Sequence, residues 1–285
     1  MTKNIQARSK GERILFGVCF ALFSLYALTL IFPFAWCFIS SFKKSIVSNL
    51  WGLPKVWRWQ NWSEALSITV KTVSVPGMFF NSMVFVAVGT VLSIASCSLT
   101  AYTISKYRFK CRSFLYVLAL VIMMVPTMGS LASTYRMYVR LGLYNTYFGI
   151  FVMYLNGFGG YFLFLYGFFV SLPWTYAEAA MVDGASHLRV FLQIMLPIAM
   201  PALGAVGILC AIGIWNDYFT VYLFAPQKAT IAVGLNYVQN AISGGSIKYP
   251  HPFALIILST LPILAIFIVF QKTIMDRMAL GGIKG

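Results

Sequence analysis

The sequence predicts an all-α protein that crosses a lipid bilayer six times. Hydrophobic residues make up 60% of its 285 residues, charged residues only 9%, and the mean hydropathy is +0.82. An average soluble domain has about 25% charged residues. Uncharged apolar runs recur along the chain, and one helical crossing needs about 20 apolar residues. The composition therefore excludes an ordinary soluble domain and predicts a polytopic membrane protein.

The distribution of basic residues supports this fold class. The chain carries 21 Lys and Arg against 6 acidic residues, a formal net charge of +15. In a soluble protein that charge would suggest nucleic acid, but here the cations form short clusters beside apolar runs. Cytoplasmic loops of membrane proteins are enriched in Lys and Arg. We therefore interpret the charge as orienting the chain in the membrane, and expect no nucleic-acid partner.

The first span is expected at residues 14–42, after a basic start that stays in the cytoplasm. The run is too long and too aromatic for a cleaved signal peptide. An external segment, 43–71, follows with four tryptophans, Trp51, Trp57, Trp59 and Trp62. Tryptophan is enriched at the membrane–water interface, so an interfacial belt is expected there, with stacking on sugar rings as the alternative.

The remaining five spans are expected at residues 72–105, 113–135, 146–171, 199–222 and 253–271. The clearest cytoplasmic marker is the turn 106–112, which has four cations and no acid. It places both termini in the cytoplasm, with a short external turn at 136–145 and a longer external loop at 227–252. The expected domains are an N-terminal part (1–71), a permeation core (72–277) and a C-terminal tail (278–285).

A polar island interrupts the apolar sequence from Glu178 to Pro197. Asp183-Gly184 predicts a helix stop, because glycine accepts the positive φ of a helix C-cap. A helix is expected before it, at 174–182. After it, Leu188, Phe191, Leu192 and Met195 have the spacing of an apolar helical stripe, which predicts a second helix ended by Pro197. Two short helices around a glycine corner predict a docking element for a partner protein; the alternative is an amphipathic loop on the membrane surface.

The same stretch resembles the coupling loop of permease subunits of binding-protein-dependent ABC importers. That loop carries E-A-A, three residues, G, nine residues and I-x-L-P, and this chain matches at Glu178, Ala179, Ala180, Gly184, Ile194, Leu196 and Pro197. The resemblance implies a MetI-like permease fold in which residues 173–197 contact the ATPase subunit. It places that contact at Glu178, Ala179, Ala180, Asp183, Gly184 and Arg189.

Further motifs are similar to those of sugar-importing, maltose-type small permeases over roughly residues 72–285. They are Asn81-Ser82, the L-G-L-x-N-T-x-x-G pattern of 141–149, the W-N-D-Y of 215–218, the T-I-A-V-G-L of 230–235 and the G-G-I-K-G ending. The resemblance implies a sugar or oligosaccharide substrate. It also implies a loop reaching the binding protein, with Thr230, Gly234, Asn236, Gly244 and Gly245, and a tail with Lys284 running along the ATPase.

Asp217 is the one acidic residue expected within a span. A charged side chain at mid-membrane costs about 2.5–3.5 kcal/mol, so it should face water, a partner or the interface. Its aromatic neighbours are expected either in an interfacial belt or along a translocation path. Under the second interpretation, the substrate path comprises Asn81, Ser82, Trp215, Asn216, Asp217, Tyr218 and Tyr222.

The sequence shows no evident catalytic, nucleotide-binding or metal-binding motif. It lacks the G-x-x-x-x-G-K-[ST] phosphate loop, its two histidines are expected to be remote from any acid, and its five cysteines show no metal-binding spacing. We therefore expect a non-catalytic subunit without a metal or cofactor, since ATP and Mg²⁺ would bind partner subunits. The alternative is an ion-coupled secondary transporter or channel, which would need buried acids.

The expected assembly follows from the resemblance. It comprises a second permease, in a heterodimer, two ATPase subunits and an extracytoplasmic solute-binding protein, all at a bacterial inner membrane.

Overall fold

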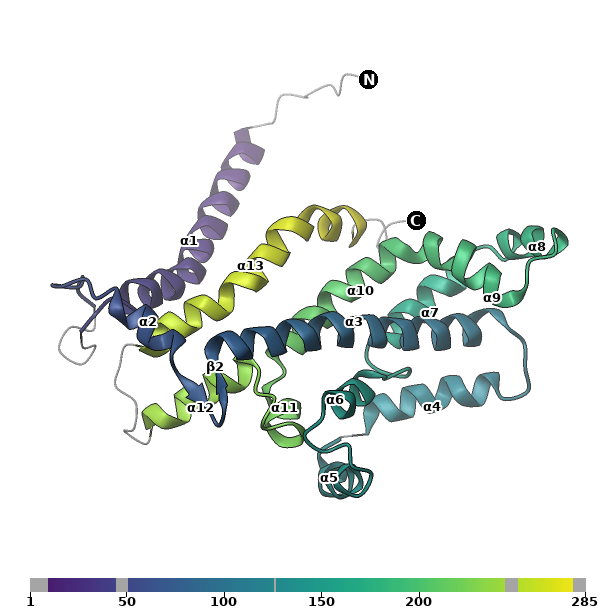
Figure 1. Cartoon of the computed structure of the whole chain (residues 1–285). Coiled ribbons are helices and arrows are strands. Elements are labelled where there is room, and N and C mark those ends of the chain that lie inside the picture. The colour runs from purple at the N-terminus through teal and green to yellow at the C-terminus, as the bar shows by residue number, and fades with distance from the viewer. Residues whose placement is uncertain (1–9, 45–50, 126, 244–250, 279–285) are drawn as a thin grey trace. The chain divides into compact units, whose positions relative to one another are not determined.

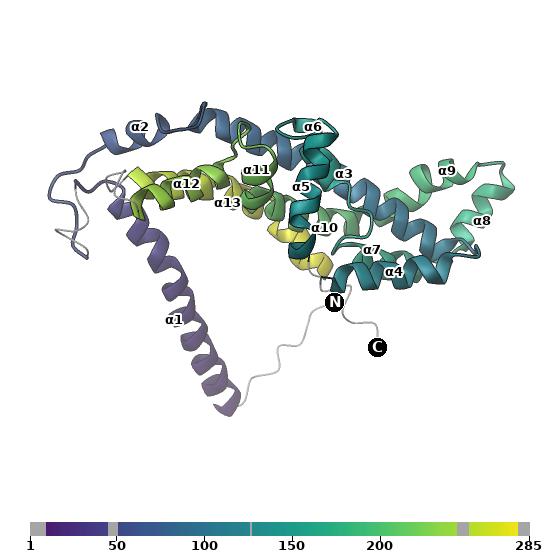
Figure 2. The same ribbon diagram turned by 90° about the horizontal axis from the view of Figure 1, so that it is seen from below.

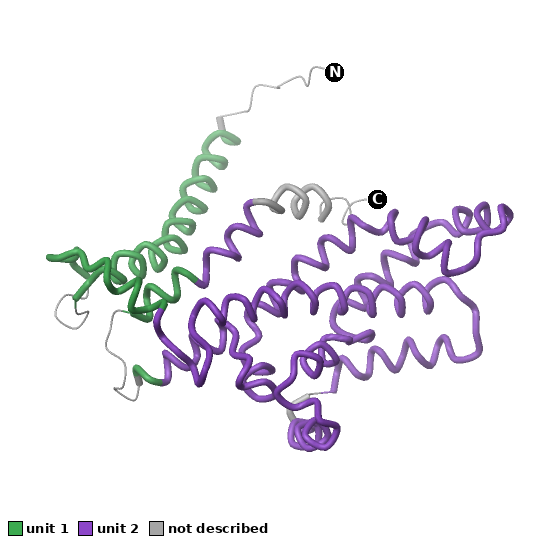
Figure 3. Tube along the Cα trace, in the orientation of Figure 1, with its two compact units in different colours: residues 1–66, 241–258 green, residues 67–240, 259–285 purple. Residues whose placement is uncertain are grey.

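The computed structural model describes residues 10–44, 51–125, 127–243 and 251–278. The chain forms two compact units, shown in different colours in Figure 3. Unit 1 comprises residues 1–66 and 241–258, and unit 2 comprises residues 67–240 and 259–285. The domain boundaries expected at residues 71 and 277 stay predictions.

Unit 1 is built on α1 (Lys10–Ser40) and α2 (Gln60–Leu66), together with the start of α13 (His251–Met278). Phe42, directly after α1, is almost fully buried. Its ring lies 5.3, 4.7 and 5.7 Å, between centroids, from the rings of Trp57, Trp59 and Trp62. Three of the four tryptophans expected at the interface therefore also pack around one buried phenylalanine.

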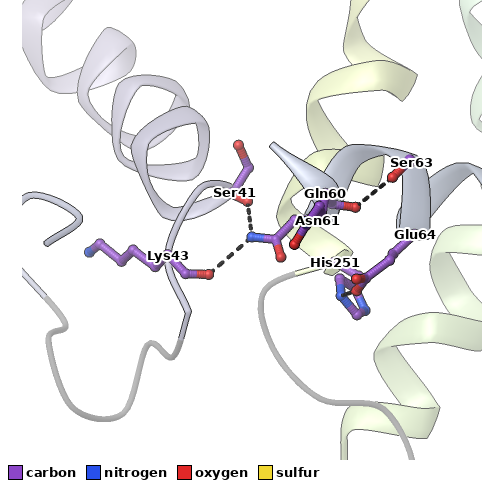
Figure 4. Close-up of polar contacts among 7 residues, drawn as sticks. All are labelled: Ser41, Lys43, Gln60, Asn61, Ser63, Glu64 and His251. Atoms are coloured by element: carbon purple, nitrogen blue, oxygen red, sulfur yellow. Dashed lines mark hydrogen bonds and ion pairs between the residues drawn. The ribbon is translucent and has the colours of Figure 1, made fainter. Parts of the chain in front are cut away.

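Polar contacts complete unit 1 (Figure 4). The buried Asn61 amide donates to the carbonyl oxygens of Ser41 at 2.7 Å and Lys43 at 3.0 Å, which fixes the chain as it leaves α1. His251 Nε2 lies 2.5 Å from Glu64 Oε2, so α2 contacts the first turn of α13. The expectation that His251 is remote from any acid is wrong, because the fold joins residues distant in sequence.

In unit 2, the long helix α3 (Val75–Lys106) packs against α6 (Tyr147–Tyr154), α7 (Phe162–Ser171) and α10 (Leu196–Asn216) (Figures 1 and 2). Small residues permit this close packing, as is common between membrane helices. A Cβ atom on Gly89 would lie 2.6 Å from the Tyr154 ring, and one on Gly207 would lie 2.9 Å from Ile94. Glycine therefore permits both close contacts, and the Tyr154 ring leaves less room at Gly89 than the flexible Ile94 side chain leaves at Gly207.

The remaining elements of unit 2 are short. A hairpin pairs β1 (Thr69–Val70) antiparallel with β2 (Val73–Ser74). The others are α4 (Arg112–Met124), the 3₁₀ helix η1 (Thr127–Ser130), α5 (Leu131–Arg140), α8 (Thr175–Val182), α9 (His187–Val190), the π-helix η2 (Phe191–Met195), α11 (Tyr218–Phe224) and α12 (Ile231–Ser243), whose last three residues belong to unit 1.

Four helices within the described ranges are long and apolar enough to cross a membrane: Gly11–Ser40, Val75–Lys106, His187–Asn216 and His251–Ile268. The other two predicted spans, 113–135 and 146–171, are not continuous helices. The first contains the short apolar helix α4, then η1 and α5, and the second contains α6 and α7. Each of the six predicted ranges therefore contains apolar helix, but the third and fourth are interrupted, and the fifth breaks at Asp217, between α10 and α11.

Sequence features explain the interruptions of the third and fourth predicted ranges. Val125 ends α4 with extended backbone, φ −77° and ψ 121°, the conformation that a following proline imposes. The segment 155–161, between α6 and α7, contains three glycines, which are poor helix formers. Both stretches are uncharged, so a search for apolar runs does not detect them.

The structure of residues 141–149 explains why the L-G-L-x-N-T-x-x-G pattern has its glycines, asparagine and threonine. Gly142 and Asn145 adopt φ +68° and +59°, conformations that glycine and asparagine tolerate best. Thr146 caps α6 by accepting from the backbone N–H of Gly149 at 3.0 Å. A side chain at Gly149 would collide with the Leu143 carbonyl. The predicted external turn 136–145 thus starts later, because α5 runs to Arg140.

Candidate functional site

The polar island folds as a helix, a glycine corner and a second helix. Gly184 has φ +84°, which confirms the predicted helix stop. Its N–H donates to the Met181 carbonyl at 3.0 Å, and the N–H of Ala185 donates to the Ala180 carbonyl at 2.9 Å. These two bonds form a Schellman motif, which closes α8 and requires the left-handed conformation at residue 184.

The second helix does not end at Pro197, as predicted, but continues through it. Ser186 caps the start of α9, and the helix runs from His187 to Asn216 through the π-turn η2. The N–H of Leu196 donates to the Phe191 carbonyl, five residues back, immediately before the proline that lacks an N–H. α9 and η2 are therefore continuous with the long helix α10.

This register divides the predicted apolar stripe. Phe191 and Met195 are buried, whereas Leu188 and Leu192 are exposed. Phe191 packs against the buried Tyr102 of α3 with ring centroids 4.8 Å apart. The predicted apolar stripe therefore lies at the edge of the packed face of the helix, with two of its side chains buried and two exposed.

Contacts with the end of α3 hold the glycine corner in place. Tyr107 lies edge-on to Trp174 and His187, at centroid distances of 5.7 and 5.3 Å, and its hydroxyl is 3.1 Å from His187 Nδ1. Lys106 Nζ donates to the Leu172 carbonyl at 2.5 Å. The basic turn predicted to mark the cytoplasm and the predicted coupling loop therefore lie at the same end of unit 2.

We define the coupling surface as the exposed side of α8, of α9 with the adjoining η2, and of the corner between α8 and α9. Five predicted coupling residues are exposed there, Glu178, Ala179, Asp183, Gly184 and Arg189, and Ala180 is half-buried. The structure adds four exposed apolar side chains, Tyr176, Val182, Leu188 and Leu192, with Val182 at 88% exposure. Apolar side chains surrounded by charges suit a docking surface. In the sequence, these four side chains are marked only by being apolar and close to the E-A-A…G motif.

A second site, called the central cavity below, is an open pocket of about 270 Å³ lined by α3, α10 and the segment 155–161 of unit 2. Asp217, between α10 and α11, lies on its wall. Its carboxylate caps α11 by accepting from the Thr220 N–H at 3.0 Å, and it accepts from the Tyr154 hydroxyl at 3.3 Å. Asp217 is half-buried, and its carboxylate thus has two hydrogen-bond donors within unit 2.

The unwound segment supplies the polar wall of this cavity. The Asn156 carbonyl accepts from Cys97 Sγ at 3.0 Å, and the Gly157 carbonyl accepts from Thr100 Oγ1 at 2.6 Å. Irregular backbone at membrane depth is tolerated where it is buried in protein or lines a cavity. Tyr154 and Asn156 were missed by sequence reasoning, although the glycine-rich stretch 157–160 was a visible signal.

The other residues predicted for the substrate path do not line this cavity. Trp215 is buried, with its ring 6.2 Å from that of Phe79. Asn216 donates to the Ile212 carbonyl of its own helix. Tyr218 and Tyr222 are exposed on α11.

Asn81 and Ser82 form a buried anchor for the chain before α12. The Asn81 amide donates to the Ala229 carbonyl at 3.0 Å and accepts from the Tyr147 hydroxyl at 2.6 Å. Ser82 Oγ accepts from the Ile231 N–H at 2.9 Å.

The segment predicted to reach the binding protein begins as a packed helix. Thr230 is buried at the start of α12, and a Cβ atom on Gly234 would lie 2.6 Å from Met78 Sδ. Asn236 is half-buried and accepts from the Asn240 amide at 3.1 Å. The prediction of a free loop is therefore wrong for residues 231–243. Gly244, Gly245 and Lys284 lie outside the described residues.

Comparison with known proteins decides between the transporter classes. A model of the family described as "binding-protein-dependent transport system inner membrane component" matches residues 5–280. The chain belongs to this family. It is a permease, the multi-pass and non-catalytic membrane component of an ABC importer, and members of the family work with a partner permease, an ATPase and a solute-binding protein.

Three similarities place the permease within the family. It is 30% identical to the diacetylchitobiose uptake system permease protein of Streptomyces coelicolor, over 98% of this chain and 92% of the relative. It is 29% identical to the trehalose/maltose transport system permease protein of Thermococcus litoralis, over 92% and 94%. A chain from the crystal structure of a bacterial ABC transporter involved in importing the acidic polysaccharide alginate matches 94% of this chain and 99% of its own, with a TM-score of 0.78 and 24% identity. The last similarity confirms the fold.

Proposed function

We propose that this permease imports a sugar or oligosaccharide, driven by ATP hydrolysis in partner subunits. The exposed coupling surface carries the proposal, since it presents the complete E-A-A…G motif on a rigid corner at one end of unit 2. The proposal of a sugar as substrate class is supported by two relatives, which are named for diacetylchitobiose and for trehalose and maltose. Each is aligned over at least nine-tenths of the chain.

The proposed assembly contains a second, different permease, two ATPase subunits and an extracytoplasmic binding protein. Both termini are proposed to lie in the cytoplasm of a bacterial cell, on the side of the coupling surface. The contact of Lys106 with Leu172 supports this orientation, since it joins the basic turn to the start of the coupling element. In the same assembly, Lys284 is proposed to lie along the ATPase.

Within the membrane, the proposed substrate path runs past the central cavity. Asp217, Tyr154 and Asn156 contribute a carboxylate, a hydroxyl and an amide to its wall, and such groups bind sugar hydroxyls. Asn81 and Ser82 act indirectly by positioning residues 229–231, and the following α12 and residues 244–245 are proposed to face the binding protein.

The test is reconstitution of the four-component transporter in lipid nanodiscs. Binding protein loaded with diacetylchitobiose, maltose or trehalose is added, and the rate of ATP hydrolysis is measured. We expect at least one of these sugars to stimulate hydrolysis over the unloaded binding protein. Uptake that continues without ATP and follows an ion gradient would overturn the proposal in favour of a secondary transporter.

A further inference from the structure

Unit 2 contains a second, open cleft of about 450 Å³ that none of the preceding roles uses. Four tyrosines and one lysine line it, together with apolar side chains. They come from five segments: Lys71 from the β1–β2 turn, Tyr135 from α5, Tyr144 from the turn after it, Tyr222 from α11 and Tyr237 from α12. Of the predicted path residues, only Tyr222 is among them.

The cleft lies away from the coupling surface. In both views of the chain, α11 and α12 lie far along unit 2 from α8 and α9 (Figures 1 and 2). In the orientation proposed above, the cleft is on the outer side, where the binding protein releases its sugar. It is therefore placed to meet substrate before the central cavity does.

One wall of the cleft is rigid. The Tyr135 and Tyr144 rings meet edge to face, with centroids 5.4 Å apart and planes at 74°. Tyr135 also contacts Phe224, whose carbonyl accepts from the Asn145 N–H at 2.7 Å. Burial, together with the neighbouring Tyr135, raises the pKa of the Tyr144 hydroxyl.

The other wall is accessible. Tyr222 is 54% exposed and Tyr237 is 47% exposed. Among the described residues, neither hydroxyl has a hydrogen-bond partner, and Lys71 stands exposed at the hairpin turn with φ +55°. The cleft thus combines aromatic rings with hydroxyl and ammonium groups that have capacity to bind a ligand.

We propose that this tyrosine cleft is a sugar-binding subsite at the outer mouth of the permease, which holds about one or two sugar rings of the incoming substrate. Tyrosine rings pack against the C–H face of a sugar ring, and the hydroxyls and Lys71 bond its hydroxyls. The subsite rests on the proposed sugar-import function and adds a first contact outside the central cavity.

The chemistry of the wall favours a sugar over an acyl chain or an apolar helix. Either apolar occupant would cover the hydroxyls of Tyr222 and Tyr237 and the Lys71 ammonium without bonding them. Burying polar groups without hydrogen-bond partners is unfavourable. A hydroxyl-rich ligand of similar size removes that cost.

The test uses the reconstituted transporter and diazirine derivatives of diacetylchitobiose, maltose and trehalose, delivered by the binding protein. After illumination, labelled peptides are identified by mass spectrometry. We expect label on the peptides that contain Tyr222 or Tyr237. Replacing both by Ala should lower that labelling, and uptake at subsaturating sugar, by about threefold to tenfold.

Two comparisons make the result specific. Phe219→Ala removes an exposed ring from α11 outside the cleft and should change neither readout. The double Tyr→Phe variant keeps the rings and should lie between the wild type and the double Ala variant.

Sugar-stimulated hydrolysis with no label on these peptides would overturn the subsite alone, as would crosslinks from position 237 to the partner permease in every nucleotide state. No stimulation by any of the three sugars would count against the proposed function and the subsite together.

Discussion

The coupling surface and the central cavity of unit 2 differ in how sequence relates to structure. At the coupling surface, six predicted residues lie within twelve positions of the chain, and a local motif at Gly184 arranges them. At the cavity, Asp217 bonds Tyr154 of α6 and shares the lining with residues of α3 and of the segment 155–161, which long-range packing brings together. Local backbone rules therefore govern the first site, and helix packing governs the second. Substitutions at the two sites and at the packing around them should therefore differ in their effects on uptake and stability.

The largest effect is expected from Gly184→Val. A β-branched residue at φ +84° is strained by about 1–3 kcal/mol, so the corner should open. We expect the ATPase to be lost on co-purification and uptake to fall by about tenfold or more. Asn tolerates left-handed backbone, and nothing lies within 4 Å of a Cβ at this position, so Gly184→Asn should retain most activity. Equal loss in both variants would contradict a conformational role.

The next effect tests the packing beneath the cavity. Gly89→Ala places a Cβ 2.6 Å from the Tyr154 ring, and overpacking of this kind costs about 1–3 kcal/mol. We expect a lower unfolding temperature in detergent for the purified complex and weaker uptake. Gly204→Ala, in α10, meets nothing within 4 Å and serves as the matched control. A Gly89→Ala protein as stable as the control would show that the close approach of α3 and α6 is not needed.

A smaller effect is expected at the anchor of α12. Ser82→Ala leaves the buried N–H of Ile231 without its partner, at a cost of about 1–3 kcal/mol before relaxation. Amide exchange of residues 229–235 should speed up, while ATPase co-purification stays normal because the coupling surface is untouched. Ser98→Ala, which removes only a hydroxyl bonded to the Ala95 carbonyl of its own helix, is the control. Unchanged exchange in Ser82→Ala would remove the anchoring role.

The smallest stability effect separates two roles of Asp217. Asn caps helices about as well as Asp, so Asp217→Asn should keep the cap of α11, whereas Asp217→Ala should lose about 1 kcal/mol. Thermal unfolding measures this difference. If the charge also binds sugar, uptake should fall in both variants. Full uptake by Asp217→Asn would limit Asp217 to its capping role.

Sequence alone determined the features that depend on composition and on short-range backbone chemistry. The low charge and repeated apolar runs predicted the membrane class, and Asp183-Gly184 predicted the corner with its positive φ. A glycine helix stop needs only the residues around it. The E-A-A…G spacing then carried the family resemblance, which the family match over residues 5–280 confirms.

Only the tertiary structure decided where apolar and polar side chains face. Leu188 and Leu192 share a stripe with Phe191 in the sequence, yet Phe191 packs against Tyr102 of α3 and the two leucines are exposed. The segment 155–161 is as uncharged as the helices on either side, but its carbonyls bond Cys97 and Thr100 instead of continuing a helix. His251 meets Glu64 from far along the chain. In each case the deciding partner is absent from the local sequence, because hydropathy records transfer from water and not which neighbour satisfies a given group.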